Sequence, residues 1–310
     1  MTRLEISHCS SCTELDQVVE LCGRAFQNTP LEYFKRHILC DATLRPENTL
    51  IGRKGGRILS SVQIFPRVCW VEGRRMRFAG IGNVATDPAE QKQGYAGQLL
   101  TEAIRRMKDD GFLFSTLTTS INNYYAKFGY VSVPREVAFF ANAPAGKLSH
   151  GIRLFSRHRD YASIRELYER YNREGTGPIA RDEQYWEAQF QFCGEDPALF
   201  FILEHGGHLA GYIRGAEEKG VIQILEFGAP GDIPAAFKTL LGAVCAARPG
   251  KKARLFLCER EKRRLASLPE HTLQRDTDTM VLPLDQSTSQ ILVTKFMSPG
   301  EYMFWSSDFF

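Results

Sequence analysis

The sequence predicts an α/β (α+β) chain in which two domains of one fold follow one another. The order helix, three strands, long helix, strand occurs twice along the chain. The turns at Gly55-Gly56 and Gly206-Gly207 stand in the same context within the two copies, in "GRKGGRILSSVQI" and "LEHGGHLAGYIRG". A length of 310 residues suits two domains of ordinary size. Together these observations indicate an internal repeat.

In the first copy, a helix is expected over 13–26, capped by Thr13, because its apolar residues recur at helical spacing. Gly-containing turns at 54–56 and 72–73 divide 49–86 into three strands. An amphipathic helix follows over 96–110 and is expected to end at Gly111. A strand over 112–120, a short helix over 122–130 and a last strand over 132–143 complete this copy. The residues expected to face inward are Leu15, Val18, Val19, Cys22, Leu99, Leu100, Ala103, Ile104 and Met107.

The second copy repeats this order with a helix over 161–174, three strands within 199–230, a helix over 232–247 and a strand over 253–259. Its last strand is expected over 279–286. The predicted domains are therefore a first domain over 1–142, a linker over 143–150, a second domain over 151–285 and a C-terminal tail over 286–310. The tail is expected to reach toward the cleft of the first domain.

Composition excludes several classes of function. A net charge of +3 and a pI near 8.4 are too mild to favour nucleic acid or a membrane surface as a partner. The basic run at 259–265 is interrupted by glutamates and fits a solvated helix face. The first residues are polar and acidic where a signal peptide is apolar, and no run has the length of a membrane span. A cytoplasmic protein is expected, and its oligomeric state is left open, a homo-oligomer included.

No metal site is expected. The eight cysteines are scattered, and the single C-x-x-C pair, Cys9 and Cys12, has no second ligand pair. His205 and His208 fall on a predicted hairpin turn, where surface histidines are the plainer interpretation. Free thiols in a reducing compartment account for the cysteines.

A glycine-containing turn joins the strand that ends near Thr86 to the long helix. Gly94 and Gly97 stand where the helix begins, although glycine costs about 1 kcal/mol against alanine inside a helix. The start of a helix presents free N–H groups and partial positive charge, and glycine lets an anion approach the backbone. The turn has neither the G-K-[ST] of a P-loop nor G-x-G-x-x-G, and Lys92 is its one charged side chain. The backbone is therefore expected to bind a pyrophosphate.

Residues 91–96, "QKQGYA", fit the pattern [QR]-x-x-G-x-[GA] and resemble motif A of the GCN5-related N-acetyltransferases, the GNAT superfamily. The later "YYAKFGY" resembles the Y-x-x-x-G-[FY] element of that family, so the resemblance covers most of 1–142. It implies that each domain is a mixed, mostly antiparallel twisted sheet flanked by helices. It also implies acetyl-CoA as co-substrate and a primary amine as acceptor, either a small molecule or a lysine side chain.

The resemblance assigns residues to acetyl-CoA in three groups. The backbone of one strand edge would pair with the pantetheine arm, as an added strand would: Val84, Ala85 and Thr86. The turn would hold the pyrophosphate: Gln91, Lys92, Gln93, Gly94, Tyr95, Ala96 and Gly97. The end of the next strand would flank the thioester: Ser120 and Ile121. The second copy has no such motif, so one cofactor per chain is expected.

Two residues are expected to move protons. The resemblance places the general acid at Tyr125, four residues before Gly129, because a phenol is protonated at neutral pH. The tandem copies, "IARDEQYW" and the aromatic C-terminus resemble the enhanced-intracellular-survival (Eis) acetyltransferases, in which the terminal carboxylate is the base. That role would fall to Phe310, with Asp308 as a substitute; the chain is expected to lack the full third, sterol-carrier-like domain of those proteins.

The acceptor side is expected within the loop 26–41, where Glu32 and Asp41 would attract a cation or simply be solvated. Two other classes of function stay open. One is a non-catalytic acyl-CoA-binding regulator, which the presence of Tyr125 beside an intact loop disfavours. The other is an aminoacyl-tRNA-dependent peptidyltransferase, which would want a basic face and typically lacks an intact CoA loop.

Overall fold

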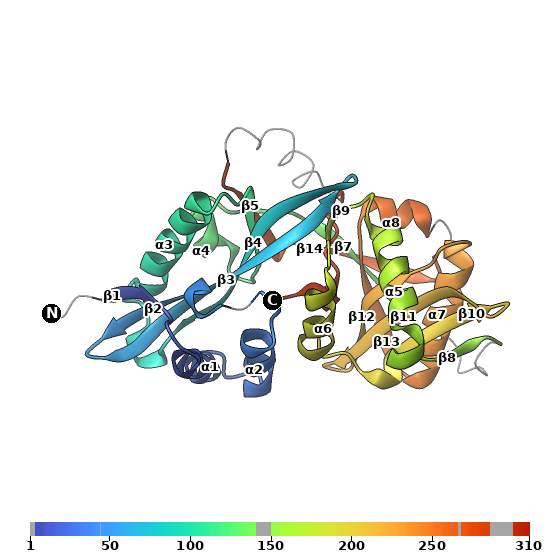
Figure 1. Ribbon diagram of the computed structural model, residues 1–310, viewed down its shortest axis with the longest axis horizontal. Helices are drawn as coiled ribbons and strands as arrows, with labels where there is room; N and C mark the ends of the chain where they lie inside the picture. The colour runs from blue at the N-terminus through green and yellow to red at the C-terminus, as the bar shows by residue number, and fades with distance from the viewer. Residues whose placement is uncertain (1–3, 44, 141–149, 266–267, 286–299) are drawn as a thin grey trace.

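The computed structural model describes residues 4–43, 45–140, 150–265, 268–285 and 300–310. Two sheet-and-helix lobes lie side by side, and the C-terminus lies between them (Figure 1). None of the helices in these ranges has both the length and the apolar character needed to cross a membrane. The linker expected over 143–150 and the first part of the tail fall almost wholly outside the described residues.

The first sheet has the strand order β1-β2-β3-β4-β5-β15-β6, and β9 pairs with the far end of β3. Neighbouring strands are antiparallel except for β4 and β5, which are parallel. The hairpin turns at Gly55-Gly56 and Glu72-Gly73 have positive φ, as predicted for β2–β3 and β3–β4. The strands are β1 Glu5–His8, β2 Thr49–Lys54, β3 Arg57–Val71, β4 Arg74–Thr86, β5 Phe114–Thr118, β6 Val131–Ser132, β9 Thr176–Ile179 and β15 Thr279–Pro283.

The second sheet has the order β14-β7-β13-β12-β11-β10-β8, with β12 and β13 as its parallel pair. Both sheets are thus mixed and mostly antiparallel, which confirms the predicted fold class. The strands are β7 Arg135–Phe140, β8 Ile152–Leu154, β10 Phe200–His205, β11 His208–Glu218, β12 Val221–Gly228, β13 Lys252–Leu257 and β14 His271–Asp276.

The two halves exchange one strand each, which the sequence did not predict. Strand β7, expected in the first sheet, pairs with β13 and β14 in the second. Strand β15, expected in the second, pairs with β5 and β6 in the first. A local pattern specifies a strand and its two faces, but two edges of the same kind compete for it and the pattern does not choose between them. The division at 142 therefore separates sequence copies but not sheets.

Helices cover the first sheet on both faces. One face packs Leu50, Val62, Ile64 and Ile81 against α3. The alternate residues Ile51 and Ala85 face α1 and α2. Helix α1 begins after Ser11, whose side chain accepts from the Glu14 N–H, so the cap is not Thr13 as predicted. All the residues predicted to face inward are buried except Ile104, which is partly buried. These helices are α1 Cys12–Ala25, α2 Leu31–Leu39, α3 Tyr95–Asp109 and α4 Asn122–Ala126.

The second sheet is packed in the same manner. Helices α5 and α7 pack against the strands of this sheet, and α6 lies near the C-terminus, on the side of the first lobe (Figure 1). The helices are α5 Arg157–Asn172, α6 Glu183–Phe192, α7 Ile233–Ala247 and α8 Glu259–Arg264. Short 3-10 turns include η1 Pro46–Asn48, η2 Pro88–Glu90 and η4 Ser306–Asp308.

Candidate active site

The parallel strands β4 and β5 part soon after they meet. In the part of the chain that the structure describes, their register consists of Ala79 opposite Ser115 and Gly80 opposite Thr116. The other edge of β4 pairs with β3 as far as Thr86. The backbone of β4 beyond Gly80 therefore turns an unpaired edge toward the opening between the strands, where an extended amide-bearing chain can pair.

A bulge lies in this part of β4. The register with β3 shifts between Ser61 and Gln63, and Asn83 has a φ of 50°. Asparagine tolerates this left-handed conformation better than most residues. The Ser61 hydroxyl donates to the Asn83 carbonyl at 3.1 Å, and the Asn83 amide donates to Gln63 Oε1 at 2.8 Å, so the bulge is fixed from both sides. Sequence reasoning missed Asn83; glycines at 80 and 82 inside a strand were the available signal.

The predicted pyrophosphate turn lies between β4 and α3, after the short 3-10 turn η2. Lys92 and Gly94 have φ values of 62° and 78°, and Gly94 stands at the N-cap of α3 with no side-chain cap bond. Residues 91–94 are exposed and residues 95–97 are partly exposed, and the first N–H groups of a helix have no partner within the helix. The end of β4 precedes this turn and consists of Val84, Ala85 and Thr86, where the edge toward β5 has no strand partner. The first turn of α3 consists of Tyr95, Ala96 and Gly97.

Two aromatic residues within and just after α4, Tyr124 and Phe128, lie next to the first turn of α3. A Cβ on Gly97 would lie 3.4 Å from Phe128 Cζ and 3.7 Å from the Tyr124 hydroxyl. Ser120 and Ile121 lie just past the end of β5, and Ile121 is 58% exposed. The Ile121 N–H donates to Thr119 Oγ1 at 3.1 Å.

Tyr125 lies on α4 and is buried in the core beside Ile81 and Leu117. Its ring contacts Tyr124 and Tyr130 edge to face, with centroids 5.2 and 6.2 Å away. Burial raises the pKa of Tyr125 to about 12, and the neighbouring Tyr124 contributes in the same direction. The phenol is therefore protonated at neutral pH and able to donate a proton.

Phe310 lies against the first sheet. A Cβ on Gly80 would fall 2.1 Å from Phe310 Cζ, and a Cβ on Gly82 would fall 3.6 Å from the Phe310 carbonyl carbon. Both glycines therefore leave room for the end of the chain beside the bulge. The Phe310 ring stacks on Phe65 at 5.1 Å and meets Phe304 edge to face at 5.7 Å.

The expected acceptor loop is largely helix α2, and its acids have other partners. Asp41 is buried and accepts from Arg67 through both carboxylate oxygens. Burial alone would raise the pKa of Asp41, but the charge and hydrogen bonds of Arg67 outweigh it and lower the pKa. Glu32 is exposed and lies 3.9 Å from Lys35. Neither acid is a free charge beside Phe310, whose ring lies 5.6 Å from the Arg67 guanidinium.

Asp308, expected as a substitute base, is fully buried and bound by Arg181 at 2.8 and 2.9 Å. It serves as a structural anchor. His205 and His208 are exposed on their turn, and the described residues contain no group of three or more metal-ligating side chains.

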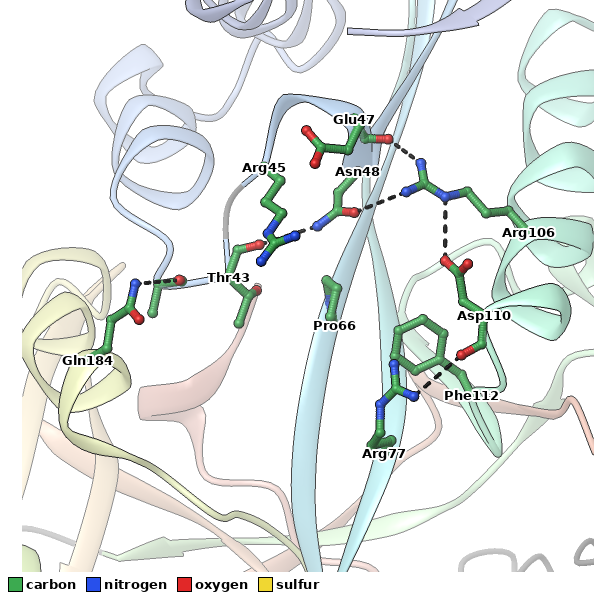
Figure 2. Close-up of a pocket in the computed structure, with 11 residues that line it drawn as sticks. Thr43, Arg45, Glu47, Asn48, Pro66, Arg77, Arg106, Asp110, Phe112 and Gln184 are labelled. Atoms are coloured by element: carbon green, nitrogen blue, oxygen red, sulfur yellow. Dashed lines mark hydrogen bonds and ion pairs between the residues drawn. The ribbon is translucent and has the colours of Figure 1, made fainter. Parts of the chain in front are cut away.

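A separate polar cavity of about 590 Å³ opens near the C-terminal end of α3 (Figure 2). Arg106 crosses it to Asn48 at 3.4 Å and to Asp110 at 3.5 Å, and Arg77 donates to the Asp110 carbonyl at 3.4 Å. Gln184 of α6 reaches the same rim and donates to the Ala42 carbonyl at 3.3 Å. Because the pyrophosphate turn is at the N-terminal end of α3, this cavity lies apart from it.

A bulged strand, a splayed parallel pair and an open helix N-terminus, all on one chain segment, are the architecture of an acyl-CoA-dependent acyltransferase. Residues 10–133 match the family model described as the acetyltransferase (GNAT) domain. Residues 10–133 are therefore similar to a GNAT acetyltransferase domain, and the chain has two GNAT-like sheets.

Relatives and solved structures agree with this placement. The chain is 28% identical over 144 residues to the N-acetyltransferase Eis of Mycobacterium tuberculosis and of Mycobacterium bovis. That match covers 42% of this chain, and the chain spans about a third, 36%, of those relatives.

Among solved structures, a probable N-acyltransferase from Enterococcus faecalis gives a TM-score of 0.72 at 16% identity, over 93% of this chain and 74% of the other. A GCN5-related N-acetyltransferase from Kribbella flavida gives 0.69 at 19%, over 91% and 72%. Eis1 from Mycobacterium abscessus gives 0.65 at 18%, over 91% and 74%. At these identities the likeness concerns the fold.

Proposed function

We propose that this protein transfers an acetyl group from acetyl-CoA to a primary amine, on a small molecule or a lysine side chain. The observation that carries the proposal is the continuity of two features. The strand β4, with its unpaired edge, is followed along the chain by the short 3-10 turn η2 and then by the glycine turn at the start of α3. One extended ligand with amides at one end and a pyrophosphate at the other fits both.

Within this proposal, the backbone of Val84, Ala85 and Thr86 holds the pantetheine arm. Gln91 and the turn from Lys92 to Gly97 hold the pyrophosphate, mainly through N–H groups. Ser120 and Ile121 flank the thioester. The start of α7 supports one acetyl-CoA per chain, because Asp232 caps that helix with its own carboxylate and Pro234 removes an N–H. The negative charge of the Asp232 carboxylate would repel a second pyrophosphate at the start of α7.

Transfer proceeds by direct attack of the neutral amine nitrogen on the thioester carbonyl carbon. The C–N bond forms, the C–S bond breaks, and Tyr125 gives its proton to the leaving thiolate. The terminal carboxylate of Phe310 in this 310-residue chain accepts the proton of the amine, directly or through water. Its place beside Gly82 and the β4 bulge supports this role, because the thioester end of the ligand would lie at the same opening. Eight free thiols support a reducing, cytoplasmic location.

The test is release of CoA thiol from acetyl-CoA with polyamines, aminoglycosides, amino acids and lysine peptides, with acetyl-CoA binding measured by calorimetry in parallel. We expect turnover with one class of amine. Binding without any turnover would favour the acyl-CoA-binding regulator instead. A chain extended by one glycine after Phe310 moves the carboxylate by about 3.5 Å and is expected to bind acetyl-CoA normally but turn over at least tenfold more slowly. Unchanged turnover would remove Phe310 from the mechanism.

A further inference from the structure

The last turn of the chain is embedded in the second lobe. Ser307 and Asp308, in η4, are both fully buried, whereas Phe309 and Phe310 are partly exposed. The Ser307 hydroxyl donates to Glu226 Oε2 on β12 at 2.7 Å, and Gln189 of α6 donates to the Ser307 carbonyl at 2.9 Å. The tail therefore crosses from the second lobe to the first within two residues.

Arg181 is the centre of this seat. It binds the Asp308 carboxylate with two N–H groups at 2.9 and 2.8 Å, donates to Ser307 Oγ at 2.9 Å and also binds Glu226. Its guanidinium lies 3.9 Å from the Tyr168 ring centre and 4.4 Å from that of Trp186, which hold it in place. A two-pronged contact of this kind restricts the orientation of a carboxylate as well as its position.

The seat contains four charges that are fully buried. Arg181 and Arg214 are balanced by Glu226 and Asp308. Burial alone would raise the pKa of Glu226, but Arg181 and Arg214 hold it at about 2. Charges taken out of water are costly unless each is paired, and an apolar cluster would stabilise the fold as well. The four buried charges are therefore better explained by the need to hold the tail in one defined position than by a gain in stability.

The seat also falls where the second sheet repeats the geometry of the first. Strands β12 and β13 are paired at Gln223 and Arg254 and then have no further register among the described residues, as β4 and β5 part beyond Gly80. Glu226 lies on β12 beyond that point, and η4 packs against β12 there. In the first sheet, the opening between β4 and β5 would admit the ligand. In the second sheet, the corresponding opening between β12 and β13 lies where the chain's own tail packs.

We propose that Arg181, with Glu226 and Gln189, forms a positioning site for the proposed active centre of the other sheet. By fixing Ser307 and Asp308 it confines Phe310, two residues later, to within about 7 Å. The end of the chain is thereby held beside Gly82 and the β4 bulge. The catalytic consequence rests on the proposed acetyl transfer; the anchoring itself does not.

The experiment compares two variants that each remove one buried hydroxyl from Glu226. Ser307→Ala removes the contact of the tail with Glu226 and Arg181. Tyr212→Phe removes the hydroxyl that donates to the other Glu226 oxygen at 2.8 Å and that has no hydrogen bond to the described tail residues 300–310. Arg181→Lys keeps the charge and loses the two-pronged contact. Release of Phe310 by carboxypeptidase A is measured alongside kcat and the KM for acetyl-CoA.

We expect Ser307→Ala to release Phe310 about tenfold faster than the parent chain, and Tyr212→Phe to release it at the parent rate. The value of kcat should fall in Ser307→Ala while the KM for acetyl-CoA stays constant. Arg181→Lys should show faster release of Phe310 and a lower kcat, both to a greater extent than Ser307→Ala. If Arg181→Lys does not fold, the comparison of Ser307→Ala with Tyr212→Phe is sufficient to test the anchoring. Equal release from Ser307→Ala and Tyr212→Phe overturns the anchoring. Faster release with unchanged kcat keeps the anchoring and instead refutes the role of the Phe310 carboxylate in the proposed function.

Discussion

Replacing Gly80 by alanine tests whether the position of Phe310 controls turnover. The new methyl group would lie 2.1 Å from Phe310 Cζ, where carbon atoms need roughly 3.5–4 Å. Strand β4 cannot yield, because Gly80 is paired with Phe65 on β3 and with Thr116 on β5. The ring at the chain end is the part that must move, by about 2 Å.

The size of the effect follows from what the ring loses. Displacement removes the stack on Phe65, the edge-to-face contact with Phe304 and the contact with the Arg67 guanidinium. Aromatic pairs contribute about 0.5–1.5 kcal/mol each and an Arg–ring contact about 0.5–1 kcal/mol. A loss of about 2–3 kcal/mol lowers the equilibrium constant for the tail in its observed position by about 30- to 150-fold. We expect kcat to fall by that factor and acetyl-CoA binding to stay constant.

A double-mutant cycle makes the assay decisive. Phe310→Ala removes the ring and keeps a terminal carboxylate, so the three atoms nearest to the methyl group of Gly80→Ala are then absent. We expect the double variant to equal Phe310→Ala in kcat within about twofold. Gly242→Ala is the control for the substitution itself, because no atom lies within 4 Å of its new Cβ on α7. If the two effects multiply in the double variant, the clash with Phe310 is not the cause and the reasoning fails.

Three further predictions concern the turn, the acid and a buried histidine. Gly94→Ala should raise the KM for acetyl-CoA about tenfold through strain at φ 78°, whereas Gly56→Ala, with the same φ and equally open space in a hairpin, should not change it. Tyr125→Phe should lower kcat about 100-fold, as measured by thiol release, and Tyr124→Phe by less than about threefold; equal losses would contradict the assignment. Burial, with a smaller contribution from Arg36, lowers the pKa of His37 to about 4, so the unfolded chain binds the extra proton between pH 6.5 and 4. The free energy of unfolding should fall by about 3 kcal/mol as pH drops through that window, and urea titrations of His37→Phe should lose this slope.

Local features of the first copy were predictable because they depend on residues that are close together in the sequence. The turn from Thr86 to Gly97 joins a strand to an amphipathic helix, so sequence alone predicted where β4 ends and α3 begins. The anion site at this turn stays a prediction. The inward face of α3 followed from spacing. Ser11 displaced Thr13 as the cap of α1 because both residue types cap well and the choice depends on where the first turn closes.

Features that depend on distant pairing were not predictable. Strands β7 and β15 have the right pattern for either sheet, and nothing local says which edge each will join. Asp41 was expected as a charge open to an acceptor, yet Arg67, far along the chain, neutralises it. The bulge at Asn83 is set by Ser61 and Gln63 on the neighbouring strand. In each case the deciding partner lies at least twenty residues away, beyond the reach of periodicity.

The exchange of strands and the seat of the tail connect the second copy to the first sheet. Strand β15 closes the first sheet between β5 and β6, so that sheet is incomplete without residues 279–283. The described tail then passes through the second lobe before it returns to β4. The second copy lacks the [QR]-x-x-G-x-[GA] motif, but its strands β12 and β13 part as β4 and β5 do, and η4 packs against β12. Substitutions on β12 and α6, far in sequence from the GNAT motif, should for that reason affect turnover before they affect binding of acetyl-CoA.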